Sequence, residues 1–145
     1  MSNGLSSSGY FFEDLLVGQT ATLSKTITEA DIQMYSVVCL DTNPIHLDEE
    51  AGRQSRFGGR VAHGMLSAGL IAALLGTRLP GPGTIYLKQS LMFRAPVRPG
   101  QTVRAIVEIT DLNLSRKSAT LRTRCLVKED VVIDGEACVL VPARP

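Results

Sequence analysis

One stretch near the middle of the chain limits the folds that the chain can adopt. From Val61 to Leu75 the sequence VAHGMLSAGLIAALL is almost entirely apolar, and no polar residues recur at the spacing that would mark a solvent-facing side. The run is shorter than the about 20 apolar residues that cross a bilayer, so protein must cover it. We therefore predict a central helix that starts at His63 and Gly64, is buried on all sides and ends at Gly76.

The second half of the chain has the alternating pattern of a β-sheet. Apolar residues at every second position from Val103 to Ile109 share one strand face, and polar residues occupy the other. We expect strands at residues 19–27, 84–93, 103–110, 118–127 and 131–141. Before the apolar stretch, Thr28 suits a helix N-cap because Asp31 follows three residues later. One strand, two helices and then a run of strands indicate an α+β fold in which an antiparallel sheet curls around the apolar helix.

Composition argues against several classes of function. The formal net charge of +1, with 5% aromatic residues and no Trp, gives no electrostatic or stacking basis for nucleic-acid binding. The first residues, MSNGLSSSG, lack the features of a secretory signal, and no segment is long enough to cross a membrane. We expect a cytoplasmic protein without membrane contact.

Chain length and cysteine spacing limit the number of domains and the role of the cysteines. The 145 residues fit a single domain over 1–145, with residues 1–9 expected to be disordered. Cys39, Cys125 and Cys138 form no CxxC pair, which argues against a disulfide framework or a zinc knuckle. We interpret all three as small core residues.

A polar turn precedes the apolar stretch and carries candidate chemistry. In Asp41 to His46, DTNPIH, Pro44 rules out a continuous helix, and Asn-Pro favours a turn. The carboxylate and the imidazole can therefore fold toward one point. Two interpretations are open, namely an acid–base site beside the start of a buried helix and an ordinary surface loop that ends a helix.

Three segments together resemble a known family, the MaoC-like dehydratases or (R)-specific enoyl-CoA hydratases. They are DTNPIHLD at 41–48, AHGM at 62–65 after Phe57, and LKQSLMFRAPVRPG at 87–100. The resemblance extends from about residue 19 to residue 141. Two positions depart from it: Leu40 stands where members often have Gly, and Ala72 stands where some bacterial hydratases have Ser.

The resemblance implies a hot-dog fold, in which a five-stranded antiparallel sheet wraps around a long central helix. It also implies a homodimer, with the option of a higher oligomer, and an acyl-CoA or acyl-ACP thioester bound near the subunit interface. Asp41 and His46 would be the catalytic pair, and Gly64 would lie in the oxyanion hole. We assign substrate binding to a further set of residues: Asn43, His63, Met65 and Arg94. No cofactor and no metal are expected, since coenzyme A is part of the substrate.

The chemistry of hydration fits these residues. Adding water across a trans-2-enoyl-CoA needs an activated water at C3, a proton at C2 and stabilisation of the charge on the thioester oxygen. A neutral imidazole at His46 can act as general base, and Asp41 can relay a proton to C2, which predicts syn addition and an (R)-3-hydroxyacyl-CoA product. The first amides of the helix at Gly64 lack intrahelical partners and can bind the oxygen. Such a reaction serves fatty-acid or polyhydroxyalkanoate metabolism.

Other interpretations remain open. Asp41, His46 and His63 contain the residue types of a two-His-one-carboxylate metal site. Ser67 has the chemistry of a nucleophile, but MLSAG lacks the first glycine of a nucleophile elbow, so we interpret Ser67 as a helix-packing residue. Dehydration of 3-hydroxyacyl-ACP, thioester hydrolysis and a non-enzymatic acyl-thioester-binding subunit are the alternative functions.

Coenzyme A carries phosphates, which guanidinium groups bind well. The candidates for this contact are Arg53, Arg56, Arg60, Lys88, Arg94 and Arg98. Each of them also has the simpler interpretation of a solvated surface charge.

Overall fold

The computed structural model describes residues 9–145. The predicted disorder of residues 1–9 lies outside the described residues, except at Gly9. The elements are η1 (Phe12–Asp14), β1 (Thr20–Thr26), α1 (Glu29–Cys39), α2 (Pro44–Leu47), α3 (Glu49–Gln54), α4 (Gly64–Thr77), β2 (Ile85–Phe93), β3 (Thr102–Asn113), β4 (Ser118–Val127) and β5 (Asp130–Leu140). All five expected strands are present within a few residues of their predicted bounds. None of the described helices is long and apolar enough to span a membrane.

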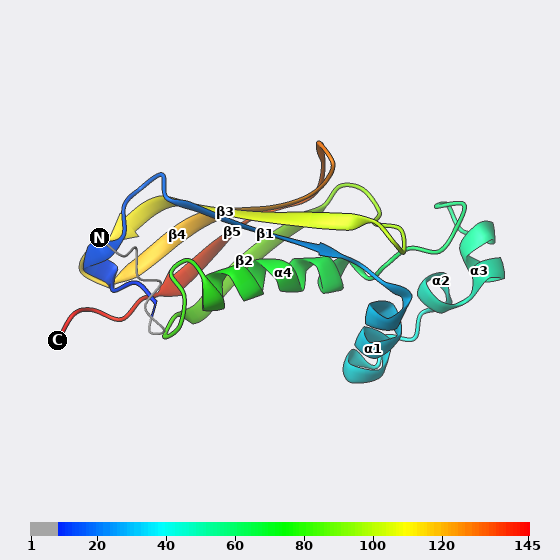
Figure 1. The fold of residues 1–145 in the computed structure, drawn as a ribbon, viewed down its shortest axis with the longest axis horizontal. Helices are drawn as coiled ribbons and strands as arrows, with labels where there is room; N and C mark the ends of the chain where they lie inside the picture. Colours follow the sequence, from blue (N-terminus) through cyan, green and yellow to red (C-terminus); the bar gives the residue numbers. More distant parts are fainter. Residues whose placement is uncertain (1–8) are drawn as a thin grey trace.

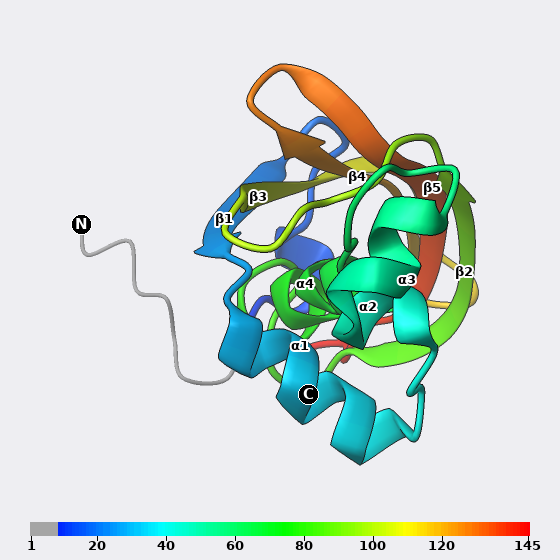
Figure 2. The ribbon, with the colours of Figure 1, turned by 90° about the vertical axis from the view of Figure 1, so that its right-hand side faces the viewer.

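The strands form one antiparallel sheet in the order β1-β3-β4-β5-β2, so β1 and β2 are its edges. Seen end-on, the sheet curves around α4, which lies in its concave face (Figure 2). This arrangement confirms the predicted α+β class and the hot-dog fold.

The core lies between α4 and the concave face of the sheet. On β3 the predicted inward face, from Val103 to Ile109, is fully buried, and α4 contributes Ile71 and Leu74 from the opposite side. Burying one such side chain contributes about 1.5–3 kcal/mol, so this layer is the main source of stability. Cys125 belongs to it, and burial raises the pKa of its thiol to about 12.

Only one side of α4 is buried, so the prediction of burial on all sides is wrong for the single chain. Ser67, Ile71 and Leu74 face the sheet, whereas Met65 is 53% exposed and Gly69 is also exposed. The reason is that a sheet curved around a helix still leaves its open side uncovered. An apolar strip along α4 is thus available to another surface.

Gly76 does not end α4 as predicted. It stays helical, and the helix continues to Thr77, whose hydroxyl donates to the Ala73 carbonyl at 2.6 Å. The end comes at Arg78, whose amide donates to the Leu74 carbonyl, and the tight turn that follows carries Gly81 at a positive φ.

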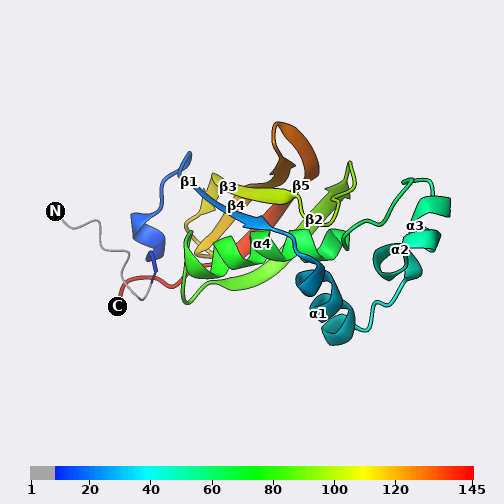
Figure 3. The same ribbon diagram turned by 45° about the vertical axis from the view of Figure 1, so that its right-hand side comes forward.

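Three helices extend beyond one end of the sheet, opposite the end where the C-terminus lies (Figures 1 and 3). α1 starts with the predicted capping box, in which the Thr28 hydroxyl accepts from the Asp31 amide at 3.1 Å and the Asp31 carboxylate accepts from the Thr28 amide at 2.9 Å. Because α1 projects from the body, Cys39 at its end is exposed, and its assignment to the core is wrong.

Sequence patterns alone missed α3, which lies within the polar, charged run from residue 47 to 59. The Asp48 carboxylate caps this helix by accepting from the Ala51 amide at 3.0 Å. α2 was also missed: Pro44 is its first residue and Asn43 its N-cap, an arrangement in which the missing proline amide loses nothing. Asp41 lies outside α2, as the Pro44 argument required.

Candidate active site

The polar turn and the start of α4 meet at one point. His46, on α2, is 7% exposed, and its Nδ1 donates to the Val61 carbonyl at 2.7 Å. In the opposite direction, the Val61 amide donates to the Ile45 carbonyl at 3.2 Å. These two bonds fix α2 against the segment that leads into α4. Because Nδ1 carries the hydrogen, Nε2 of His46 keeps its lone pair and can accept a proton.

His63 joins this turn to α1. It is the N-cap of α4 but makes no side-chain cap bond, because its Nε2 donates to the Asp41 carbonyl at 3.0 Å and contacts the Ser36 hydroxyl at 3.1 Å. Its ring stacks on that of His46, with centroids 3.8 Å apart, and Tyr35 lies on another side at 4.6 Å. Burial lowers the pKa of His63, against the opposing effect of the Asp41 carbonyl. His63 thus positions the turn as a neutral, buried ring.

Asp41 lies at the exposed end of the site. One of its carboxylate oxygens accepts from the Asn43 amide at 3.3 Å, and the carboxylate lies within 4.8 Å of ring nitrogens of both His46 and His63. Two hydrogen bonds of about 2.8 Å to one water span about 4.5 Å, so this separation suits a water shared by Asp41 and His46.

Leu40, just before Asp41, has φ 60° and is the C-cap of α1. This left-handed conformation favours glycine, which explains why a small residue is expected there.

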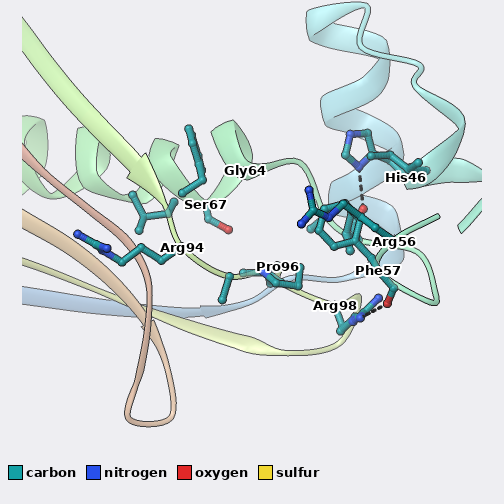
Figure 4. Close-up of a pocket in the computed structure, with 15 residues that line it drawn as sticks. His46, Arg56, Phe57, Gly64, Ser67, Arg94, Pro96 and Arg98 are labelled. Atoms are coloured by element: carbon teal, nitrogen blue, oxygen red, sulfur yellow. Dashed lines mark hydrogen bonds between the residues drawn. The ribbon is translucent and has the colours of Figure 1, made fainter.

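A cavity of about 660 Å³ opens beside His46 and extends past Gly64 and Ser67 (Figure 4). Its wall is mostly apolar and includes Ile45, Phe57, Phe93 and Ile133. A cavity of this size and character suits a flexible organic ligand with an apolar portion. The ring of Phe93 lies so close to Gly64 that a Cβ at Gly64 would be 2.6 Å from its Cε1.

Three arginines line the same cavity: Arg56, Arg94 and Arg98. Arg98 is engaged with the protein, since it donates to the carbonyls of Phe57 and Arg60. Arg94 is over half exposed and lies 3.7 Å from Asp134. The other basic candidates do not line the cavity: Arg53 pairs with Glu50 at 3.6 Å, and Lys88 lies on edge strand β2.

Arg60 connects the helices that carry the site. Its guanidinium donates to Glu29 of α1 at 2.5 and 2.8 Å, to Glu49 of α3 at 2.8 Å and to the His46 carbonyl at 3.3 Å. These bonds lower the pKa of Glu29 and raise that of Arg60. Nothing in the pattern of charges specifies the three partners of Arg60, so sequence reasoning could not separate it from the neighbouring basic residues.

The structure brings some predicted site residues together and leaves others apart. His46 and Gly64 share the cavity, whereas the Asn43 side chain accepts from the Ile45 amide at 3.3 Å and shapes the turn. Met65 lies on the exposed side of α4, outside the cavity lining. Ser67, interpreted as a packing residue, lines the cavity.

The geometry of the His46 and His63 rings argues against a metal site. Asp41, His46 and His63 offer ligand atoms within 4.8 Å of one another. However, the two imidazole rings are stacked with only 29° between their planes. Imidazole binds metals through lone pairs in the ring plane, and those of nearly parallel rings do not converge on one ion.

The fold and this geometry define a class: a hot-dog protein with an aspartate and a histidine side chain near the N-terminus of its central helix. Comparison with known proteins agrees, since residues 16–131 match the MaoC like domain. The chain is 55% identical over 135 residues to the (R)-specific enoyl-CoA hydratase of Rhodospirillum rubrum, covering 93% of this chain and 94% of the relative. It is 49% identical over 134 residues to the 3-hydroxybutyryl-CoA dehydratase of Methylorubrum extorquens, covering 92% and 85%.

Solved structures give the same answer. The (R)-hydratase from A. caviae involved in PHA biosynthesis superposes with a TM-score of 0.87 at 42% identity, covering 90% of this chain and 99% of that one. The chain described here belongs to the MaoC-like dehydratase family.

Proposed function

We propose that this protein is a hydro-lyase that reversibly hydrates trans-2-enoyl-CoA to (R)-3-hydroxyacyl-CoA. The observation that carries this proposal is that Asp41 and His46 lie within one water's reach of each other and that His46 lines the same cavity as Gly64. The names of two relatives, an (R)-specific enoyl-CoA hydratase and a 3-hydroxybutyryl-CoA dehydratase, support the same reaction.

In this proposal Asp41 and His46 share the catalytic water. His46 Nε2 takes a proton from the water as its oxygen adds to C3, and this proton passes through Asp41 to C2 on the same face, so one water supplies both the hydroxyl group and the C2 hydrogen and the addition is syn. The bond from His46 Nδ1 to the Val61 carbonyl holds the imidazole in the tautomer that this step needs. Acid–base assistance of this kind typically accelerates a reaction about 10²–10⁴-fold.

Gly64 would stabilise the negative charge on the thioester oxygen. It is the first residue of α4, so its amide has no partner within the helix and lies at the positive end of the helix dipole. The missing side chain leaves room for the ring of Phe93, which lies where a Cβ would be. The acyl chain would lie along the apolar wall, and Arg56 and Arg94 would contact the phosphates of coenzyme A.

We also propose that the protein is a homodimer and that residues 1–145 act as one domain. The chain exposes an apolar strip on α4 that includes Met65 and Gly69. It also exposes two other apolar surfaces. These are Met34, Val37 and Val38 on α1 and Ile85 and Leu87 on edge strand β2. An exposed, unpaired apolar edge strand tends to pair with another chain, so we expect a partner subunit to cover it. Sedimentation equilibrium would measure this, and a monomer at micromolar concentration would contradict it.

The test of the reaction is direct. Purified protein is mixed with crotonyl-CoA and, separately, with an eight-carbon enoyl-CoA, and the loss of enoyl-thioester absorbance and the chirality of the product are followed. We expect an (R)-3-hydroxyacyl-CoA, unchanged activity after dialysis against a chelator, and no release of free thiol. Thiol release would instead indicate thioester hydrolysis, and turnover confined to acyl-carrier-protein substrates would indicate an ACP dehydratase. Tight binding of enoyl-CoA without turnover would indicate a binding subunit.

A further inference from the structure

One polar group in the cavity has no role in the reaction described so far. Ser67 is completely buried, and its hydroxyl has no hydrogen-bond partner among the residues that the structure describes. An unpaired buried hydroxyl costs about 1–3 kcal/mol, so it is rarely kept without a reason. The obvious local acceptor, the His63 carbonyl one turn earlier, already accepts from the Leu66 amide at 3.1 Å.

The position of Ser67 relates it to the oxyanion site. It follows Gly64 by three residues on α4, so the two lie on the same face of the helix. Side chains on a helix lean toward its N-terminus, which brings the Ser67 hydroxyl over the turn that begins at Gly64. Both residues line the same cavity, and Figure 4 shows Ser67 beside Gly64 with its hydroxyl turned into that cavity.

We propose that the Ser67 hydroxyl is a further catalytic group, a second hydrogen-bond donor to the thioester oxygen beside the Gly64 amide. This inference rests on the proposed hydratase function. As water adds to C3, the electrons of the C2–C3 double bond move toward the thioester oxygen, and both donors stabilise that charge until C2 is protonated. Ser67 keeps its own proton and forms no covalent bond. Within the acyl group of a simple enoyl-CoA, the thioester oxygen is the atom that accepts hydrogen bonds, so it is the ligand atom that we expect to satisfy this hydroxyl.

The main variant is Ser67→Ala, with Ser118→Ala as a matched control, because Ser118 is a buried serine that does not line the cavity. We expect Ser67→Ala to lower kcat for crotonyl-CoA by about 10²-fold while KM changes little, since the bond strengthens in the transition state. The thermal midpoint should stay the same or rise, because the variant removes an unpaired buried hydroxyl. Ser118→Ala should keep wild-type kcat.

A second measurement reports on the bond itself. The carbonyl stretch of ¹³C-labelled enoyl-CoA bound to the slow Asp41→Asn variant is recorded by infrared difference spectroscopy, with and without Ser67→Ala. Loss of a donor should move this band to higher wavenumber. An unmoved band, or wild-type kcat in Ser67→Ala, would overturn the inference.

Two further outcomes would also overturn it. A fall of several degrees in the thermal midpoint would make Ser67 a structural residue. A change only in the ratio of eight-carbon to four-carbon activity would make it a wall of the acyl site. An inactive wild type, by contrast, would refute the hydratase function and is seen before any variant is made.

Discussion

Replacing Gly64 with alanine would add a methyl group beside the amide that is proposed to bind the thioester oxygen. The new Cβ would lie 2.6 Å from Cε1 and 2.7 Å from Cδ1 of Phe93. Carbon atoms in contact are normally about 3.5–4.0 Å apart, so the ring must retreat by about 1 Å. Phe93 is half exposed, which allows the ring to move.

The expected effects on stability and activity differ in size. Overpacking of this kind costs about 1–3 kcal/mol, and alanine gains up to about 1 kcal/mol over glycine in a helix. The net loss of about 0–2 kcal/mol leaves a typical domain folded. If the methyl group displaces the thioester oxygen from the Gly64 amide, the transition state loses about 2.7–4 kcal/mol, which lowers the rate about 10²–10³-fold.

The assay compares hydration of crotonyl-CoA with urea unfolding for the wild type, Gly64→Ala and the double variant Gly64→Ala/Phe93→Ala. Removing the ring should recover stability but not activity, because the methyl group remains over the amide. Wild-type activity in Gly64→Ala would refute the role of this amide. Full recovery of activity in the double variant would show that the displaced ring, and not the methyl group, blocks the site.

Three further predictions concern the residues around the catalytic turn. Arg60→Gln should lower the free energy of unfolding by about 1–2 kcal/mol and reduce kcat, because it releases α1 and α3 from each other and frees the His46 carbonyl. An unchanged free energy of unfolding together with an unchanged kcat would contradict this. Leu40→Gly should raise the free energy of unfolding by about 0.5–1 kcal/mol by relieving the left-handed conformation, and a loss measured by urea unfolding would show that the leucine side chain contributes more by packing. Because burial lowers the pKa of His63, the unfolded chain binds a proton that the folded chain does not, so stability is complete above about pH 6.5 and falls as the pH drops below it. In His63→Gln this loss between pH 8 and pH 5.5 should shrink, and equal losses in both proteins would refute the assignment.

The sheet and the capping box of α1 could be predicted because each rests on a local rule. Alternation from Val103 to Ile109 specifies a strand face, and Thr28 with Asp31 specifies a helix start. The prediction that α4 is buried on all sides failed for the single chain because composition does not tell which protein surface covers a helix. α2 had a usable signal, since Asn43 followed by Pro44 is an N-cap followed by a favoured first helical residue.

Sequence patterns named Asp41, His46 and Gly64 as candidate residues, and their catalytic roles stay predictions; the contacts that hold these residues in place had no signal in the sequence. The DxNPxH spacing pointed to Asp41 and His46, and the apolar helix start pointed to Gly64. By contrast, the contacts of Ser36 with His63 and of Arg60 with Glu29 join residues 27 and 31 positions apart. Such long-range contacts depend on the final packing of α1 against the turn, and a single sequence has no periodicity that encodes them.

The roles of Asp41 and His46 are tested by the rate of crotonyl-CoA hydration by the wild type, Asp41→Asn and His46→Gln, each checked for folding by circular dichroism. We expect an active wild type and losses of at least about 10²-fold in both variants, because each removes one of the two groups that hold the water. The double variant should be little worse than either single one, since the two residues act as a unit. Folded single variants that retain most of the wild-type rate would contradict the claim that Asp41 and His46 carry the chemistry.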